Sequence, residues 1–186
     1  HAPETMGHQR RARARLVFDE LLRVQLALVA AKVEREATVT GVTHAVGERA
    51  QGATSPGLLD AFLASLPFPL TGAQTRAIDE ILIDLERPWA MHRLLQGDVG
   101  AGKTLVALAA LLAAVQGGHQ GALMAPTEVL AEQHHRGISE LLAGFVVPAP
   151  NTLLGERPLQ VALLTSRLSA PDRRRVLAEL ASGDID

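Results

Sequence analysis

A glycine-rich segment in the middle of the chain has the residue types and spacing of a phosphate-binding loop. Residues 97–104 fit the pattern G-x-x-x-x-G-K-[ST] at every fixed position. Glycines at these positions let backbone N–H groups curl around a phosphate, and a helix that starts at the loop adds its dipole. We therefore expect a nucleotide site made of Gly97, Asp98, Val99, Gly100, Ala101, Gly102, Lys103 and Thr104.

The last two residues of this loop are the candidates for chemistry. We expect Lys103 to reach the outer phosphates of ATP and the Thr104 hydroxyl to ligate Mg²⁺. Among eighteen basic residues only Lys32 and Lys103 are lysines, and a compact ammonium fits between phosphates better than a planar guanidinium does. The alternative is a glycine-rich turn that simply joins a strand to a helix.

The composition limits the class of protein. The chain has 186 residues, of which 47% are hydrophobic and 20% are charged, and no apolar run approaches the ~18 residues of a membrane span. It contains no cysteine, which excludes disulfides, thiolate zinc sites and cysteine nucleophiles. We expect a cytoplasmic protein, with further sequence upstream because the first residue is not Met. The formal charge of -2 means that DNA contacts would have to come from local patches.

Alternating apolar segments surround the loop. Residues 9–36 predict one long helix with a basic start, and residues 37–57 predict a flexible connection. Further helices are expected at 58–66, 71–86, 103–116, 128–142 and from 169 to 183, and strands at 93–96, 121–125 and 160–165. The helix at 103–116 is apolar almost all round. This alternation predicts an α/β domain whose parallel sheet is covered by helices on both faces.

Three segments indicate one family. Residues 66–74 read LPFPLTGAQ, residues 93–96 lead into the phosphate loop, and residues 122–134 read ALMAPTEVLAEQH. Together they closely resemble the bacterial RecG helicases. The resemblance runs with few breaks from about residue 58 to 142 and resumes more loosely at 161–186, and the helix at 9–36 is similar to the segment that links the wedge domain of RecG to its motor.

This resemblance implies a superfamily 2 motor that uses ATP and Mg²⁺ to remodel branched DNA, such as replication forks and Holliday junctions, in recombination and repair. It implies a RecA-like P-loop fold, with residues 1–57 as a helical linker and residues 58–186 as the first motor lobe. We expect a monomer without membrane contact. The alternatives are a related motor, such as a transcription-repair coupling factor, and a P-loop nucleotide-binding module without helicase activity.

Individual site residues carry over by position. Gln74 matches the adenine-reading glutamine of the family, although Thr71 and Gln74 also fit a capping box at a helix start. Phe68 is expected either to stack on adenine or to anchor a turn in the core. Pro126 and Thr127 match the family's first strand-contacting motif, and Thr127 would help to bind a DNA phosphate, with a plain helix N-cap as the alternative.

The sequence also departs from the family. Thr165-Ser166 stands where the family has Thr-Gly, and the loop expected at 144–158 is longer than usual. No apolar strand after the phosphate loop ends in Asp-Glu, and the Asp79-Glu80 pair precedes the loop inside a predicted helix. We therefore expect the chain to stop before the family's DExH motif and its second lobe, and to bind ATP without hydrolysing it. A GTPase is disfavoured because neither lysine lies in an Asn/Thr-Lys-x-Asp pattern.

Overall fold

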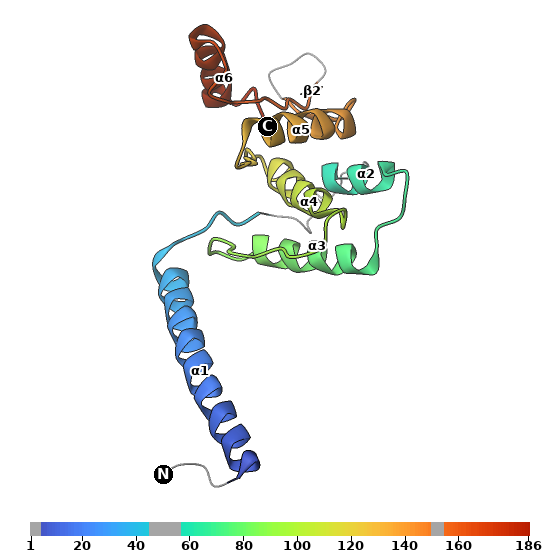
Figure 1. Cartoon of the computed structure of the whole chain (residues 1–186). Coiled ribbons are helices and arrows are strands. Elements are labelled where there is room, and N and C mark those ends of the chain that lie inside the picture. Colours follow the sequence, from blue (N-terminus) through green and yellow to red (C-terminus); the bar gives the residue numbers. More distant parts are fainter. Residues whose placement is uncertain (1–4, 45–56, 150–154) are drawn as a thin grey trace. The chain divides into compact units, whose positions relative to one another are not determined.

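The chain forms two compact units. The computed structural model describes residues 5–44, 57–149 and 155–186, so most of the predicted flexible connection at 37–57 and the middle of the predicted 144–158 loop lie outside the described residues. One unit comprises His1–Val42 and Pro88–Ala90, and the other comprises Thr43–Arg87 and Met91–Asp186. Figure 1 labels their helices and strands.

The first unit is built on one long helix, α1 (Met6–Thr38), which confirms the helix predicted at 9–36. Thr5 caps its start by accepting a hydrogen bond from the backbone N–H of His8, and the Thr38 hydroxyl donates to the Glu34 carbonyl at 2.8 Å. The basic side chains near the start of α1 and the apolar ones after them are exposed. No helix among the described residues has the length and apolar character that crossing a bilayer requires.

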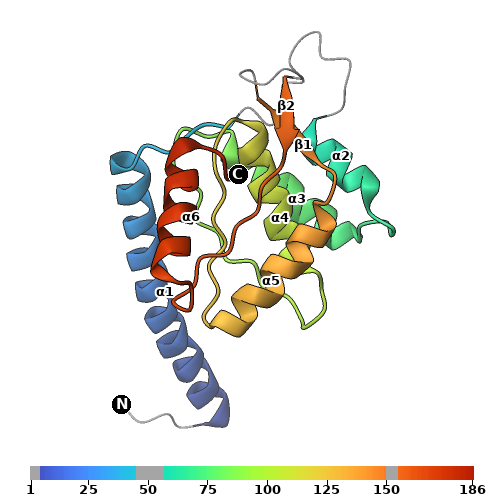
Figure 2. The ribbon, with the colours of Figure 1, turned by 90° about the horizontal axis from the view of Figure 1, so that it is seen from above.

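Five helices make up most of the second unit, and they confirm the helices that the apolar periodicity predicts. They are α2 (Leu58–Ser65), α3 (Gly72–Leu85), α4 (Lys103–Gln116), α5 (Glu128–Leu141) and α6 (Ala170–Ser182). Helices α2 and α3 pack on α4 (Figures 1 and 2), which carries half of the residues of the buried core cluster. The helix that begins at the phosphate loop is therefore also the centre of the core.

The only sheet in the described part of the chain is small and antiparallel. Strand β1 (Val146–Pro148) pairs with β2 (Glu156–Pro158), with Val147 opposite Arg157. Both strands lie in the segment predicted as a loop, because its prolines and glycines indicate turns. That prediction was wrong at both ends of the segment. Each strand ends in a proline, and a proline at the end of a short edge strand removes no hydrogen bond from the middle of a sheet.

The predicted parallel sheet is not formed among the described residues. Three segments predicted as strands are neither helix nor strand, and no two of them pair through backbone hydrogen bonds. They are residues 93–96, 121–125 and 160–165. An apolar run predicts an extended, partly buried segment, but it does not specify which neighbour accepts its backbone hydrogen bonds. The periodicity therefore identified the segments and not their pairing.

Polar contacts hold α6 and the end of the chain against the rest of this unit. Arg157 binds the Asp186 carboxylate with two hydrogen bonds of 2.7 and 2.8 Å, and this contact raises the pKa of the guanidinium. Gln120 donates to the carbonyls of Leu180 and Ile185 at 2.9 and 2.8 Å. These bonds position α6 beside the segment that precedes α5.

The two phenylalanines near α2 give a direct test of this core. Phe62 is fully buried and meets the ring of Phe145 edge-on, with ring centroids 6.2 Å apart, whereas Phe68 is 52% exposed. We predict that Phe62→Ala lowers the free energy of unfolding by about 3 to 5 kcal/mol, because it removes a large buried side chain and leaves a cavity. Phe68→Ala should change it by less than about 0.5 kcal/mol. Urea denaturation measures both, and equal losses would contradict the core described here.

Candidate nucleotide-binding site

The phosphate loop curls because two of its glycines take a backbone conformation that other residues avoid. Gly100 and Gly102 have φ values of +81° and +78°, in the left-handed region. The Ala101 N–H donates to the Asp98 carbonyl at 3.2 Å, which closes the turn. Gly102 is then the N-cap of α4, and its carbonyl accepts the first bond of the helix, from Leu105, at 3.0 Å.

The backbone of the loop is suited to a phosphate group. Among the described residues, the N–H groups of Gly100, Gly102, Lys103 and Thr104 donate to no carbonyl. The last two lie in the first turn of α4, where the helix dipole favours a negative charge. An added side chain at Gly100 would meet nothing within 4 Å, so the loop faces open space there. The residues present therefore fit a bound phosphate.

The two chemical candidates lie at the end of this loop. The Lys103 ammonium donates to the carbonyls of Gly97 and Asp98, both at 2.7 Å, which holds it across the mouth of the loop. An ammonium has three donors, so these two bonds leave a third for an anionic ligand. Thr104 is exposed, and its hydroxyl makes no hydrogen bond to another described residue. Lys103 and Thr104 thus stand where the motif predicts them.

Gln74 joins α3 to the phosphate loop. Its side-chain oxygen accepts from the Thr71 N–H at 2.8 Å, and its own N–H donates to the Thr71 hydroxyl, so the predicted capping box is confirmed. Its side-chain amide also donates to the Ala101 carbonyl at 3.0 Å. A Cβ atom at Gly102 would lie 2.4 Å from this amide nitrogen. The left-handed φ value of Gly102 favours glycine, and a side chain there would also displace the Gln74 amide.

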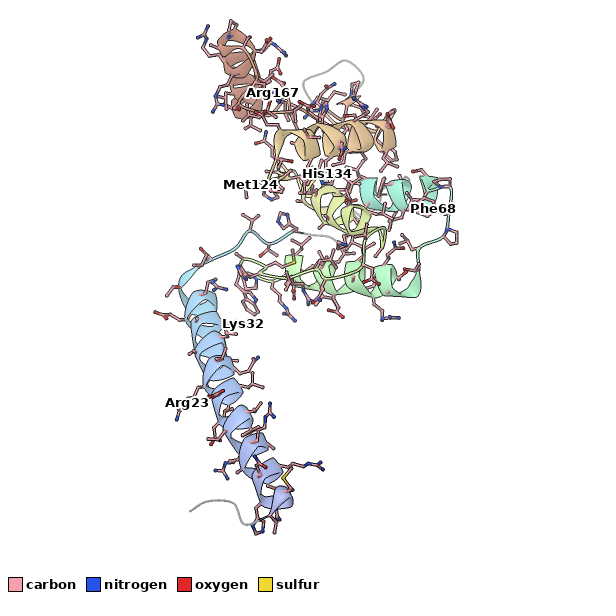
Figure 3. The ribbon with its side chains drawn as sticks, in the orientation of Figure 1. Arg23, Lys32, Phe68, Met124, His134 and Arg167 are labelled. Atoms are coloured by element: carbon pink, nitrogen blue, oxygen red, sulfur yellow. The ribbon has the colours of Figure 1, made fainter. Side chains whose placement is uncertain are left out.

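Phe68 does not anchor a turn in the core. Phe68, which Figure 3 labels, lies on the connection between α2 and α3 and is 52% exposed. The alternative of a buried anchor is therefore wrong, and Phe62 fills that place in the core instead. The predicted contact of Phe68 with adenine stays a prediction.

Arg93 is a site residue that the sequence reasoning did not single out. Its guanidinium pairs with Glu80 at 2.6 Å and with Asp84, two carboxylates one helical turn apart on α3. Hydrogen bonds to Asp84 first and Glu80 second raise the pKa of Arg93. The spacing of Glu80 and Asp84 marks one face of a helix, but nothing in the sequence shows that Arg93 faces them. Glu80 thus has a role outside the rejected Asp-Glu pair.

The candidate DNA-binding residues lie at the start of α5. Thr127 caps this helix by accepting a bond from the Leu130 N–H at 3.3 Å, which confirms the N-cap alternative, and Pro126 precedes it on the surface. Ser166, the departure from the family pattern, donates from its hydroxyl to the Glu128 carboxylate. Arg167, labelled in Figure 3, pairs with the same carboxylate at 2.8 Å. The departure therefore ties the segment at Thr165-Ser166 to the start of α5, where Pro126 and Thr127 are predicted to contact DNA.

The comparisons with known proteins agree with the resemblance seen in the sequence. The DEAD/DEAH box helicase family matches residues 71–171. The ATP-dependent DNA helicase RecG of Bacillus subtilis is 44% identical over the whole chain, and that of Mycobacterium tuberculosis H37Rv is 41% identical. Each alignment covers 24% of the relative, so the chain spans about a quarter of the length of these proteins.

A solved structure of RecG bound to a three-way DNA junction has the same fold over nearly all of this chain. Its TM-score is 0.76 with 37% sequence identity, over 97% of this chain and 22% of that one. The predicted resemblance to RecG is therefore confirmed, as is a RecG-like fold of helices with a small sheet. These comparisons do not show the predicted parallel sheet.

The contact between Ser166 and Glu128 makes a testable prediction. The pKa of Glu128 lies below its ordinary value, first because Ser166 donates to the carboxylate and then because Arg167 is close. A lowered folded-state pKa stabilises the fold above the unfolded-state pKa, and this contribution is lost as pH falls through the folded-state value. We predict that Ser166→Gly raises the pKa of Glu128 more than Arg167→Gln does. An NMR titration of the Glu128 carboxyl carbon measures both, and the opposite order would contradict the assignment.

Proposed function

This chain belongs to the DEAD/DEAH box helicase family, and from that membership we propose that it is the ATP-binding part of an ATP-dependent helicase that remodels branched DNA. The observation that supports this most is the phosphate loop, in which unpaired backbone N–H groups, Lys103 and Thr104 converge at the start of α4. Its relatives are named ATP-dependent DNA helicases, and one of them was solved on a DNA junction.

In this proposal the loop holds the phosphates of ATP. The backbone N–H groups at Gly100, Gly102, Lys103 and Thr104 donate to phosphate oxygens, the Lys103 ammonium neutralises the outer phosphates, and the Thr104 hydroxyl ligates Mg²⁺. When bound, Mg·ATP supplies the free energy of phosphoryl transfer. The residues of this chain bind and orient it.

Gln74 can read adenine without giving up the bonds that it makes. A side-chain amide has two acceptor lone pairs and two N–H donors, and the contacts with Thr71 and Ala101 use one of each. One lone pair and one N–H remain, which is the complement that the N6/N7 edge of adenine requires. The exposed ring of Phe68 then offers a face for the base to stack on.

The remaining parts of the proposal concern DNA and the larger architecture. Pro126 and Thr127 would meet a DNA phosphate at the start of α5, where the helix dipole favours an anion. Residues 58–186 would form a RecA-like first motor lobe, and residues 1–57 a helical linker, as the likeness to RecG suggests. We propose a monomer in the cytoplasm, acting on forks and Holliday junctions.

The role of Lys103 is tested by removing its ammonium. We predict that Lys103→Ala weakens the binding of Mg·ATP at least about tenfold, because a charge-assisted contact to the phosphates is lost, while the circular dichroism stays unchanged. Lys32→Ala is the matched control, since it changes the one other lysine, on α1, and should leave affinity within about twofold. Titration calorimetry measures both, and equal affinities for Lys103→Ala and the parent would contradict a nucleotide site here.

Base selection is tested at Gln74. If this side chain reads adenine, ATP should bind better than GTP, and Gln74→Ala should reduce that difference by about 1 to 3 kcal/mol. Thr71→Ala is the matched control, because it removes a capping side chain while leaving the Gln74 amide in place. It should lower stability by about 0.5 to 2 kcal/mol with the base preference intact. A Gln74→Ala protein that loses stability but keeps its preference for ATP would show that Gln74 serves only as a cap.

A further inference from the structure

The segment that leads into the phosphate loop has few contacts of its own. Residues 91–96 make no backbone hydrogen bond to another described residue. Leu94 is 90% exposed, and a cleft of about 360 Å³ lies between this segment and α3. Met91 packs against the buried core, but no sheet ladder fixes the residues between it and the loop.

The side chain of Arg93 crosses this cleft. Its Nη1 atom lies 2.6 Å from the Glu80 carboxylate, and its Nε atom donates to Asp84, so two faces of the guanidinium fork are held at once. Asp84 is the more sheltered partner, with 14% of its side chain exposed against 60% for Glu80. The pair with Asp84 is accordingly screened less by solvent. In the part of the chain that the structure describes, these ion pairs are the polar contacts that attach residues 91–96 to α3.

Helix α3 thus contacts the phosphate loop at one place and the segment that leads into it at another. Near its start, Gln74 donates to the Ala101 carbonyl, and one to three turns further along, Glu80 and Asp84 hold Arg93, four residues before Gly97. Gln74 and Asp84 are ten residues apart, which corresponds to about 15 Å along a helix. The helix therefore spans the loop from its entry to its fifth residue.

We propose that Arg93 is a positioning residue for nucleotide binding, which fixes the entry of the phosphate loop to α3 through Asp84 and Glu80. This inference rests on the proposed function of the loop. Backbone N–H groups bind a phosphate well only if they are held in place before it arrives, because ordering them afterwards costs binding free energy. Arg93 touches no phosphate in this proposal and acts through the loop.

The matched control is Arg87, which pairs with the same carboxylate. The Arg87 guanidinium lies 2.9 Å from Asp84, and Arg87 directly follows the C-cap residue of α3. Arg93→Gln and Arg87→Gln each remove one cation from Asp84, so a general effect on α3 would follow from both. An effect on the loop should follow from Arg93→Gln alone.

The first measurement is the affinity for Mg·ATP by calorimetry on the 186-residue chain. We expect Arg93→Gln to weaken binding about tenfold, since a small displacement of binding groups has effects of this size. Arg87→Gln should leave affinity within about twofold, and Arg93→Lys should restore part of the loss, because it keeps the charge without the planar fork. Equal losses in Arg93→Gln and Arg87→Gln, or no loss in Arg93→Gln, would overturn the proposal.

The second measurement does not depend on ATP. Backbone order parameters from NMR relaxation report motion of the loop amides on the picosecond-to-nanosecond timescale. Those of residues 97–102 should fall in Arg93→Gln and stay unchanged in Arg87→Gln, with the amides of α4 unaffected in both. A parent chain that bound no ATP would refute the proposed function, and the order parameters would still decide this inference. Loop amides that are equally ordered in Arg93→Gln and the parent would overturn it.

Discussion

The hydrogen bond from Gln74 to the Ala101 carbonyl joins the two parts on which the site depends. A Cβ atom at Gly102 would lie 2.4 Å from the Gln74 amide nitrogen, so a larger residue there would displace the amide from this bond. The same glycine needs its left-handed φ value to turn the chain into α4. Gly102 thus allows the phosphate loop to curl, begins α4 as its N-cap, and leaves room for Gln74 of α3. Any larger residue at this place would disturb all three at once.

The rigidity of the site comes from the core behind it. Helix α4 begins at the loop and continues into the most buried part of the molecule, where Ala109 and Leu112 are almost fully enclosed. The N–H groups of its first turn, which are proposed to bind phosphate, therefore belong to an element that cannot tilt without opening the core. Packing of α2 and α3 against α4 connects the stability of the unit to the geometry of the loop. The core and the site are parts of one arrangement.

Features set by local chemistry could be predicted from the sequence, and those set by distant pairing could not. The loop, the helices and the caps at Thr71 and Thr127 each depend on residues within a few positions of one another. The ion pairs of Arg93 and the bond from Ser166 to Glu128 join residues that are 9 to 38 positions apart. The spacing of apolar residues along the sequence does not predict such contacts. The antiparallel pair β1 and β2 was missed for the same reason, because prolines indicate a turn more strongly than they indicate a short strand edge.

The contact between Ser166 and Glu128 changes what the start of α5 can offer to DNA. A carboxylate in the first turn of a helix is favourable for the helix dipole but repels a phosphate that approaches the same N–H groups. Arg167 offsets this repulsion, since its guanidinium lies 2.8 Å from Glu128 and is itself largely exposed. A DNA phosphate at Thr127 would therefore approach a Glu128 carboxylate whose negative charge is balanced by Arg167. Where the family pattern has a glycine, the Ser166 hydroxyl adds a donor that holds the acid in place, so the proposed binding of a DNA phosphate at Thr127 would depend on both Ser166 and Arg167.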